Sequence, residues 1–333
     1  MANQKQHRMN FIPSLYAKTN FFQTRDAILF INEIAFQLKG LEIDTIVDIG
    51  CGPGTQSYQL FQKLKPKRMV AFDFSQGMIE EAKSRYQSDD KIKTIEEQDF
   101  SDKIEFYQAG ADENFKELID KINVTPGTVD VVFSSYCIHW ISVDGRPQLV
   151  ENIYRLLKPG GTFYLLKYTW SEFMEIGYSF VETPKWASYI RNRVYEASGL
   201  KLIYSNLEQI IGYQPLKISS ELDDYNTWVE LFNSKKLFLE RSSFNRSNFE
   251  YFNYEDIINQ LSQPYWRPYI ENDKLEEFDK DFREYLIESY LKSLVSKEKQ
   301  RQSMLGITEE MSESMCKLRF NYIYTLFFGK KIC

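Results

Sequence analysis

The sequence predicts an α/β fold in which helices cover both faces of a parallel sheet. Between residues 45 and 168, short apolar runs of strand length alternate at least four times with segments of helical period. Strands that are apolar along their whole length are typical of a sheet buried on both faces, and helical crossovers connect parallel strands. The length of 333 residues, of which 43% are hydrophobic and 26% charged, is that of an ordinary globular protein with one large or two small domains.

The predicted elements follow one another in a regular order. After a polar arm, apolar residues recur at helical spacing from Ala27 to Leu38, and Gly40 ends this helix. Strands are expected at residues 45–49, 69–72, 103–107, 130–135 and 162–166. Helices between these strands are expected around residues 60–64, 78–82 and 149–157.

Beyond Tyr168 the alternation of strands and helices breaks down. Residues 206–270 are expected to be irregular and helical. Charged residues interleaved with apolar ones at 276–294 indicate an amphipathic helix with a solvated face. Residues 320–329 alternate aromatic and aliphatic side chains, which predicts a strand that returns to the sheet. Because the chain shows no repeat and no Pro/Gly/Ser-rich linker, a single domain with a large inserted cap is expected.

The charge balance and the apolar runs exclude several classes of function. The chain carries 41 Lys and Arg residues against 47 Asp and Glu residues, a net charge of −6 that disfavours nucleic-acid binding. No apolar run approaches the roughly 20 residues that a membrane-spanning helix needs. The first twenty residues lack the apolar stretch and the cleavage site of a secretory signal, although their basic groups leave a mitochondrial address open.

The cysteines stand far apart and form no CxxC pair. Their positions are Cys51, Cys137, Cys316 and Cys333. Such spacing argues against a disulfide framework and against a zinc site, and it fits a reducing compartment. We therefore expect a cytoplasmic protein without a catalytic metal.

A glycine-rich loop follows the first predicted strand, at Asp48–Thr55. Gly50, Gly52 and Gly54 leave the backbone without side-chain bulk, so a ligand can lie against the turn and against the N-terminus of the next helix. A dinucleotide fingerprint would require its last glycine at Thr55, and a phosphate-binding P-loop would require Gly-Lys-Ser or Gly-Lys-Thr. The loop matches neither of these phosphate-binding patterns.

Asp73 is the second landmark, at the end of the second predicted strand. In a doubly wound sheet this position lies beside the glycine loop, where a carboxylate can accept both hydrogens of a ribose diol. The alternative is that the loop is only a tight turn and that Asp73 caps a helix. Together with the downstream stretch Leu156–Gly161, these features resemble the class I S-adenosylmethionine-dependent methyltransferases.

The resemblance implies a Rossmann-like fold with a seven-stranded, mostly parallel sheet and a helical cap insertion. Residues 1–40 would form an N-terminal arm and a helix over the active site, residues 41–167 the S-adenosylmethionine-binding core, and residues 168–333 the cap and the completion of the sheet. Asp48 would hold the amino group of the cofactor, the glycines its methionine portion and Asp73 its ribose. The positions assigned to the cofactor are Asp48, Gly50, Gly52, Gly54, Asp73, Phe74, Met78, Asp112 and Ser134. Solvent exposure is the alternative for Asp112.

The stretches Leu15–Asp26 and Ser134–Trp140 look like those of juvenile hormone acid O-methyltransferases, which esterify the carboxylate of an apolar terpenoid acid. In that branch a glutamine that matches Gln23 and a tryptophan that matches Trp140 hold the substrate carboxylate. A carboxylate with a pKa of about 4–5 is ionised at neutral pH and needs no general base. The rate then depends on how well the carboxylate is held in line with the methyl group of the cofactor. The Gln23 amide and the Trp140 indole N–H are donors that can grip one carboxylate oxygen.

Other assignments stay open at this point. His139 is a candidate base for an N- or C-methyltransferase, although a lone loop histidine also suits a hydrogen-bonded spacer. Trp170, Trp186 and Tyr189 can wall an apolar substrate pocket or pack the cap. The partners expected are a small-molecule methyl acceptor and, at most, a second copy of the chain, since a monomer or a homodimer is predicted. A non-catalytic relative retained as a subunit of a larger complex is the alternative from another functional class.

Overall fold

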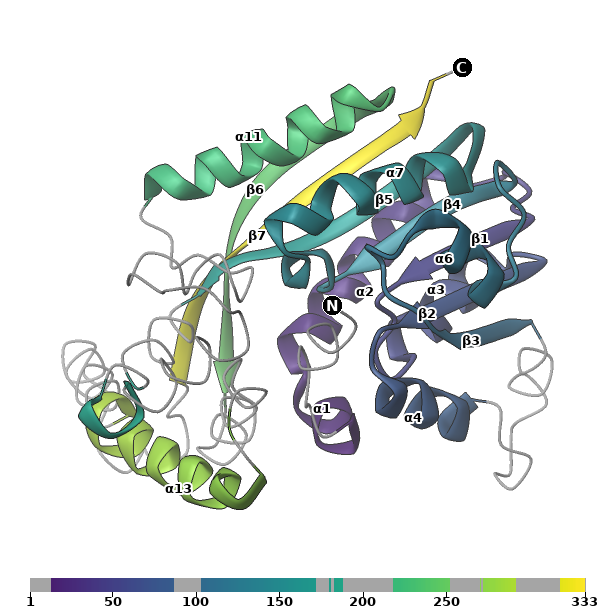
Figure 1. Ribbon diagram of the computed structural model, residues 1–333. Helices are drawn as coiled ribbons and strands as arrows, with labels where there is room; N and C mark the ends of the chain where they lie inside the picture. The colour runs from purple at the N-terminus through teal and green to yellow at the C-terminus, as the bar shows by residue number, and fades with distance from the viewer. Residues whose placement is uncertain are drawn as a thin grey trace, which may run out of the picture. The chain divides into compact units, whose positions relative to one another are not determined.

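A seven-stranded mixed sheet organises the chain (Figure 1). The computed structural model describes residues 13–86, 103–171, 180, 183–187, 218–251, 270, 272–291 and 318–332. The strands are β1 Thr45–Ile49, β2 Arg68–Asp73, β3 Ile104–Gln108, β4 Val129–Ser135, β5 Leu157–Ser171, β6 Leu237–Tyr251 and β7 Leu318–Lys331. Their order in the sheet is β3-β2-β1-β4-β5-β7-β6. The predicted α/β class is confirmed.

The register of the parallel strands brings the predicted site to one edge of the sheet. β1 is parallel to both β2 and β4, with Asp48 opposite Ala71 on one side and Phe133 on the other. The chain order reverses between β2 and β4, on either side of β1, and ligands of open α/β sheets bind beyond the carboxyl ends of the strands at such a switch point. The loops after β1, β2 and β4 therefore meet there.

The stretch Leu156–Gly161 differs from its prediction as a helix end and turn. The helix ends at Leu156, and the strand β5 begins directly at Leu157. Its register with β4 shifts between Val129 and Val131, and Gly160 within this irregular stretch has a positive φ of 75°. The glycines thus lie at an irregularity near the start of the strand.

Helices cover both faces of the sheet (Figure 1). α2 (Phe21–Gln37) and α3 (Thr55–Leu64) lie on one face, with α4 (Gln76–Tyr86) beside α3 through the stacked rings of Tyr58 and Tyr86. α6 (Phe115–Ile122), α7 (Arg146–Leu156) and α11 (Ile218–Ser234) lie on the other face. Within this set the sequence predicted α2, α3, α4 and α7 and missed α6, whose eight residues form little more than two turns.

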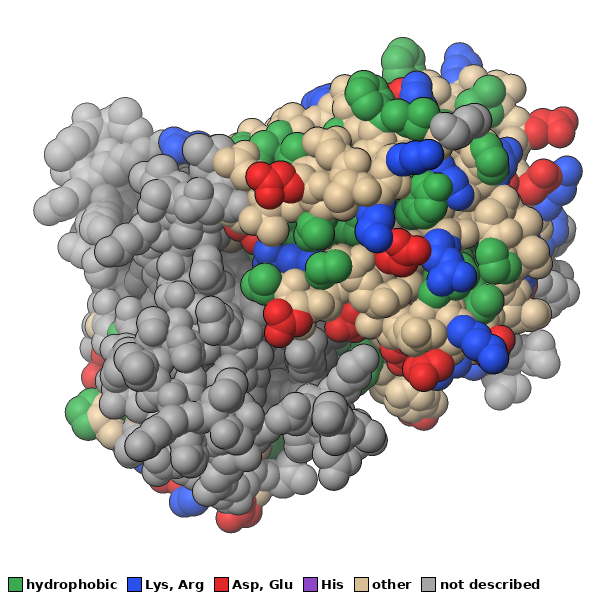
Figure 2. Space-filling model, turned by 45° about the horizontal axis from the view of Figure 1, so that its top comes forward, with side chains coloured by type: hydrophobic (Ala, Val, Ile, Leu, Met, Phe, Trp, Pro, Cys, Tyr) green, Lys and Arg blue, Asp and Glu red, His purple; other side chains and the backbone are tan. Residues whose placement is uncertain are grey.

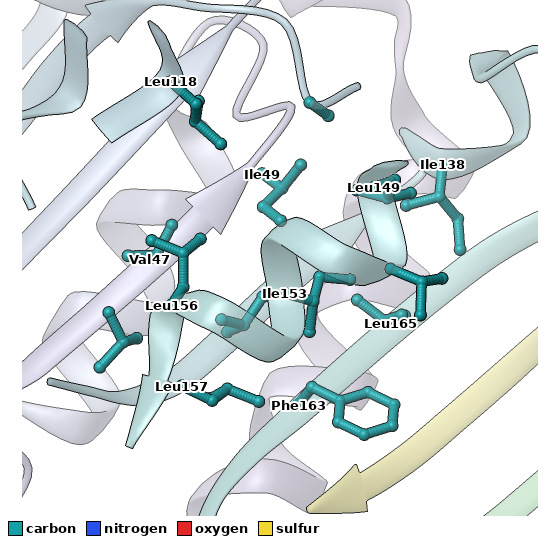
Figure 3. Packing of buried hydrophobic residues seen from close by; sticks show 14 of the residues in the cluster. Val47, Ile49, Leu118, Ile138, Leu149, Ile153, Leu156, Leu157, Phe163 and Leu165 are labelled. Atoms are coloured by element: carbon teal, nitrogen blue, oxygen red, sulfur yellow. The ribbon is translucent and has the colours of Figure 1, made fainter. Parts of the chain in front are cut away.

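The main core fills the space between the sheet and α7 (Figure 3). Val47 and Ile49 of β1 and Leu165 of β5 are fully buried, as is Ile153 of α7. In the same core, the ring of Phe163 stacks on Phe232 of α11 at 5.1 Å between centroids. Since full burial of one such side chain contributes about 1.5–3 kcal/mol, this packing fixes the strands that carry the site.

The strand β7 closes the sheet beside β5. The Thr169 and Thr325 hydroxyls lie 2.8 Å apart, whereas Phe163 contacts Gly329, so β7 runs antiparallel to β5. The predicted return of residues 320–329 to the sheet is confirmed. The expectation that residues 206–270 are irregular and helical is confirmed for α11 and wrong for β6, whose segment alternates buried Leu237 with exposed Phe238 in the period of a strand.

Contacts between Cα atoms divide the chain into two compact units. The larger unit comprises Asn20–Thr169, Ile211–Asn245 and Tyr324–Cys333, and the other comprises Met1–Thr19, Trp170–Ile210 and Arg246–Ile323. The boundaries at 1–40, 41–167 and 168–333 stay a prediction, as does the single domain that they were expected to form.

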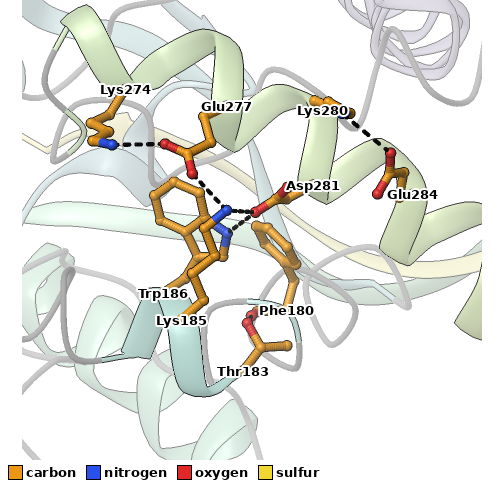
Figure 4. A network of polar contacts seen from close by, with 9 residues as sticks. All are labelled: Phe180, Thr183, Lys185, Trp186, Lys274, Glu277, Lys280, Asp281 and Glu284. Atoms are coloured by element: carbon orange, nitrogen blue, oxygen red, sulfur yellow. Dashed lines mark hydrogen bonds and ion pairs between the residues drawn. The ribbon is translucent and has the colours of Figure 1, made fainter.

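The smaller unit contains α1 (Pro13–Thr19), α13 (Leu275–Tyr285) and a π-helix at Leu286–Leu291. α13 and the π-helix account for the amphipathic helix predicted at 276–294. α13 buries Phe278 and Phe282, while Lys185 forms ion pairs with the α13 residues Glu277 and Asp281 (Figure 4).

On the described part of the surface that Figure 2 presents, Lys and Arg side chains are interleaved with Asp and Glu side chains. Charges of both signs are thus neighbours on this face. None of the helices in the described part of the chain is long and apolar enough to cross a membrane.

Replacement of Ile153 by alanine is expected to lower the free energy of unfolding by about 2–5 kcal/mol, because a fully buried side chain leaves a cavity. Urea unfolding followed by circular dichroism measures the change. Ile28→Ala is the matched control on a helix, since Ile28 is 39% exposed and its loss is expected to cost less than about 0.5 kcal/mol. Equal losses in the two variants would contradict this account of the core.

Candidate active site

The loop after β1 is shaped by glycines in the left-handed region. Gly50, Gly52 and Gly54 have φ values of 73°, 55° and 80°, which L-residues with side chains rarely adopt. The amides of Gly50 and Cys51 both donate to the carbonyl of Phe72, at 2.8 and 3.0 Å, and so hold the loop against the end of β2. Gly54 ends the loop as the N-cap of α3.

Close packing also requires Gly50 to be a glycine. A Cβ atom on Gly50 would lie 2.1 Å from the Cys137 Sγ, on the loop after β4. At Gly54 a Cβ atom would lie 3.1 Å from the Phe106 ring. The bare backbone that the sequence predicts is therefore needed for the loop to pack at all, before any ligand is considered.

Asp73 is in direct contact with the glycine loop. Its Oδ2 accepts from the Gly52 amide at 2.9 Å, and its Oδ1 accepts from the Ser75 amide at 2.8 Å. The residue is 4% exposed. Because a carboxylate has about four acceptor positions, Asp73 keeps acceptor capacity beyond these two bonds. The two landmarks that the sequence predicts to be neighbours are neighbours in the structure.

Asp48 is a second buried carboxyl group at this end of β1. It is 1% exposed, and its Oδ2 accepts from the Ser57 hydroxyl at 2.6 Å. Burial raises the pKa of Asp48 to about 7, with a further contribution from the charge of Asp73. Burial also raises the pKa of Asp73 above its ordinary value. Among the described residues, the groups that hydrogen-bond these two carboxyls are a hydroxyl and backbone amides, which are neutral.

This arrangement favours a cationic ligand. Each buried carboxyl resists ionisation because it has left water, and a nearby positive charge would restore its ionised form. S-adenosylmethionine carries a positive sulfonium and a positive ammonium group. The two carboxyl groups and the bare backbone thus fit this cofactor, for which Asp48 would meet the ammonium group and Asp73 the ribose.

The remaining residues predicted to bind the cofactor surround the same loops. Phe74 is half-buried after β2, and its carbonyl accepts from the Gln108 side chain at 3.3 Å. Met78 is buried on α4. Asp112 is half-buried after β3, with its Oδ2 2.5 Å from the position of a Cβ on Gly145. Ser134 is buried, and its hydroxyl donates to the Ile49 carbonyl at 2.8 Å. Contact of these residues with the cofactor stays a prediction.

An aromatic cluster links the residues predicted to hold the acceptor. Its members are Phe22, Tyr136, His139, Trp140 and Tyr168. Phe22 packs on Tyr136 and Tyr168 at 5.7 and 5.9 Å between ring centroids. His139 packs on Tyr168 at 5.6 Å and on Trp140 at 5.2 Å.

The cluster brings together the elements that carry Gln23 and Trp140. Gln23 follows Phe22 on α2 and is half-buried, and Trp140 is half-buried at the end of the 3₁₀-helix Ile138–Trp140 after β4. Both lie within the larger compact unit. Their role as a carboxylate clamp stays a prediction.

His139 is an inefficient proton acceptor in this environment. It is 5% exposed, and burial together with the nearby charge of Lys167 lowers the pKa of its imidazole well below 6.5. Lys167 is itself buried and forms an ion pair with Asp224 at 2.6 Å. The imidazole is therefore neutral at pH 7 and holds a proton only weakly.

The aromatic residues predicted to wall a substrate pocket have different outcomes. Trp186 is 2% exposed and packs on Phe278 at 4.9 Å, while its indole N–H donates to Asp281 at 3.0 Å (Figure 4). Packing within the smaller unit accounts for this position. Trp170 lies in β5, and its side chain is outside the described residues. Tyr189 also lies outside them.

Several residues of the site carry no signal strong enough for sequence analysis to single them out. Ser57 faces Asp48 from the first turn of α3, which the spacing of nine residues across a loop does not indicate. Asp26 and Tyr136 stand within the two stretches that carry the family resemblance, yet only the fold shows that they touch, across 110 positions. The described residues hold no group of three or more His, Cys, Asp or Glu side chains that could bind a metal ion.

Comparison with known proteins agrees with this geometry. Residues 46–161 match the family model described as "Methyltransferase domain". A probable S-adenosylmethionine-dependent methyltransferase of Saccharomyces cerevisiae is 28% identical over 145 residues, 44% of this chain and 42% of that protein. A malonyl-[acyl-carrier protein] O-methyltransferase of Hahella chejuensis is 29% identical over 116 residues, 35% of this chain and 33% of that protein. The chain thus spans less than half the length of these relatives.

Among solved structures, the YcgJ protein of Bacillus subtilis aligns with a TM-score of 0.47 at 14% identity, over 91% of this chain and 98% of that chain.

Gly50→Ala is expected to weaken binding of S-adenosylhomocysteine at least about tenfold, because the new methyl group clashes with Cys137. Gly40→Ala is the matched control. Gly40 also has a positive φ, 83°, but no atom lies within 4 Å of its Cβ position, so it shares the backbone strain without the clash. Isothermal titration should show unchanged affinity in the control. Equal affinities in the two variants would mean that the loop has another shape.

Affinity for S-adenosylhomocysteine, which retains the ammonium group, is expected to rise between about pH 6 and pH 8. The pKa of Asp48 near 7 means that its carboxyl is largely protonated at the lower pH and must lose a proton to face a cation. The rise is at most about tenfold per pH unit and flattens above the pKa. Asp48→Asn should weaken binding and flatten the profile, while exposed Asp44→Asn should do neither. A flat profile in the unsubstituted protein would refute the assignment.

The matched region and the candidate site coincide. The interval 46–161 contains the glycine loop, Asp73 and the His139–Trp140 pair. Its strands have the order and the parallel register described above. Residues 46–161 match a methyltransferase domain, and their parallel strands have the order of a Rossmann-like α/β sheet.

Proposed function

We propose that the protein transfers the methyl group of S-adenosylmethionine to the carboxylate of a small apolar acid. The observation that carries the proposal is the pair of buried carboxyl groups at the glycine loop, Asp48 and Asp73, in contact with neutral donors only among the described residues. This pair favours a ligand with positive charge, and S-adenosylmethionine has positive charge next to a nucleoside. When bound, the cofactor supplies the sulfonium methyl, whose bond to sulfur breaks as the bond to the acceptor oxygen forms.

The acceptor is proposed to be a carboxylate because His139, the candidate base named from the sequence, accepts a proton poorly in its buried setting. The imidazole of His139 has a pKa well below 6.5 and would take a proton from an alcohol or an ammonium group poorly. A carboxylate is already ionised at neutral pH and needs only to be held in line. Gln23 and Trp140 would donate to one of its oxygens and leave the other to attack the methyl carbon.

An apolar tail on the acid is supported by the aromatic cluster. Phe22, Tyr136 and Tyr168 pack on one another at 5.7 to 5.9 Å between ring centroids, and Phe22 directly precedes the proposed donor Gln23 on α2. Rings of this kind bury hydrocarbon while the polar end of a ligand meets donors. A terpenoid or long-chain acyl acid has this chemistry.

The direct test incubates the purified protein with S-adenosylmethionine labelled in its methyl group and with farnesoic acid or dodecanoic acid as acceptor. A labelled methyl ester that dissolves in organic solvent and is hydrolysed by alkali is the expected product. Isothermal titration with S-adenosylhomocysteine runs in parallel. Binding without label transfer to either acid, or to any component of a metabolite extract, would identify a binding-only relative, and absence of binding would refute the proposal as a whole.

Trp140→Phe is expected to lower kcat/KM for the acid by about tenfold or more, because it removes one donor to a charged oxygen while an aromatic ring stays at this position. Trp228→Phe is the matched control, since Trp228 is buried on α11 in the core cluster. The methylation rate of this variant, divided by the concentration of sites that bind S-adenosylhomocysteine, should stay within about twofold of that of the unsubstituted protein.

His139→Gln discriminates between the two kinds of acceptor. In a carboxylate clamp the substitution removes a packing partner and reduces the rate by less than about tenfold. If His139 is the base of an N- or C-methyltransferase, the same substitution should abolish turnover, by about 100-fold or more. Initial rates of label transfer measured with one acceptor decide between these outcomes.

A further inference from the structure

A buried hydrogen bond joins α2 to the end of β4. The Tyr136 hydroxyl donates to Asp26 Oδ2 at 2.6 Å, and the two residues are 9% and 5% exposed. The other carboxylate oxygen of Asp26 accepts from Arg25, from Nε at 3.0 Å and from Nη2 at 2.9 Å. The adjacent guanidinium therefore balances the charge of Asp26, while the second carboxylate oxygen holds the Tyr136 hydroxyl.

The backbone of Tyr136 is held in an unusual conformation. Its φ of 55° lies in the left-handed region, which residues other than glycine and asparagine seldom occupy. Elsewhere in the described chain, Lys65 and Asn123 adopt positive φ as C-caps of helices and Lys236 adopts it in the turn before β6. Tyr136 instead follows a strand, and its amide donates to the Leu166 carbonyl at 2.9 Å. Strained residues of this kind persist where the surrounding contacts over-determine them.

The bond connects the two proposed donors. Gln23 and Asp26 are three residues apart on α2, so they lie on the same side of the helix. Tyr136 and Trp140 are four residues apart on the loop after β4, and the Trp140 amide donates to the Cys137 carbonyl at 2.9 Å. The position of α2 against this loop therefore sets the separation between Gln23 and Trp140.

We propose that Asp26 and Tyr136 are positioning residues, which hold Gln23 and Trp140 at the separation that one acceptor oxygen requires. The inference rests on the proposed function, because it assigns these residues to the same acceptor site. Neither residue needs to touch the cofactor. Small displacements of reacting groups have large effects on rate, so loss of the bond should be visible in the use of the acceptor.

The test compares Tyr136→Phe, Asp26→Asn and the double variant in the full chain, with farnesoic acid as acceptor. Each single variant is expected to raise KM for the acid or lower kcat by about tenfold, while KM for S-adenosylmethionine and the affinity for S-adenosylhomocysteine stay within about twofold. The double variant should be no worse than the poorer single variant, because both substitutions act on the same bond: Tyr136→Phe removes it, and Asp26→Asn leaves only a weaker bond to a neutral acceptor. Tyr154→Phe, on α7, is the control for loss of a tyrosine hydroxyl.

The inference would be overturned if the substitutions changed the KM for S-adenosylmethionine as much as the KM for the acid. It would also be overturned if the losses of kcat/KM in the two single variants multiplied in the double variant. Unchanged kinetics in both single variants would overturn it as well. These outcomes are distinct from failure of the proposed function, in which the unsubstituted protein does not methylate the acid at all.

A second measurement tests the inference even if the unsubstituted protein does not methylate the acid. The protein is labelled with 5-fluorotryptophan, and the ¹⁹F resonance of Trp140 is assigned by its absence from Trp140→Phe. Tyr136→Phe and Asp26→Asn should each shift or broaden this resonance, and Tyr154→Phe should leave it in place. An unmoved Trp140 resonance in the first two variants would refute the positioning role regardless of which molecule is methylated.

Discussion

The contact between the Gly52 amide and the Asp73 carboxylate, 2.9 Å long, is the interaction on which the rest of the site depends. It can form only if β1 and β2 are parallel and in register, if the loop after β1 has glycine at its positions of positive φ, and if Asp73 stands one residue beyond Phe72. Each condition is met by a different property of the sequence: apolar strands, alternating glycines and an acidic strand end. The contact turns these local features into a single binding surface at the switch point of the sheet.

Burial gives this surface its chemical character. A carboxyl group removed from water on the floor of a site is unfavourable unless a positive charge or several donors compensate it. The packing energy of the neighbouring core keeps Asp48 and Asp73 buried away from water. In this core Val47, Ile49 and Phe72 are almost wholly excluded from solvent. A ligand that brings its own positive charge releases part of this electrostatic cost on binding. Stability of the core and selectivity for a cation are thus linked through the same strand.

The cofactor side of the site follows from the sequence far better than the acceptor side. Both the loop Asp48–Thr55 and Asp73 can be recognised in the sequence. The loop needs glycine for its backbone geometry, and the position of Asp73 follows from a strand register that is fixed by burial on both faces of the sheet. The link between Asp26 and Tyr136 has no comparable local signature, since it arises from the packing angle of α2. β6 was missed for a related reason: an edge strand such as Leu237–Tyr251 carries polar residues and a weak alternation, which also suits irregular structure.

The place of β7 in the sheet has a consequence for biosynthesis. β7 lies between β5 and β6, yet more than 140 residues separate the end of β5 at Ser171 from the start of β7 at Leu318. As the chain leaves the ribosome, the hydrogen-bonding edge of β5 stays unpaired until that whole interval and β7 have been translated. An unpaired edge is a template for association with other chains, so nascent copies of this protein are expected to rely on chaperones until translation passes residue 331.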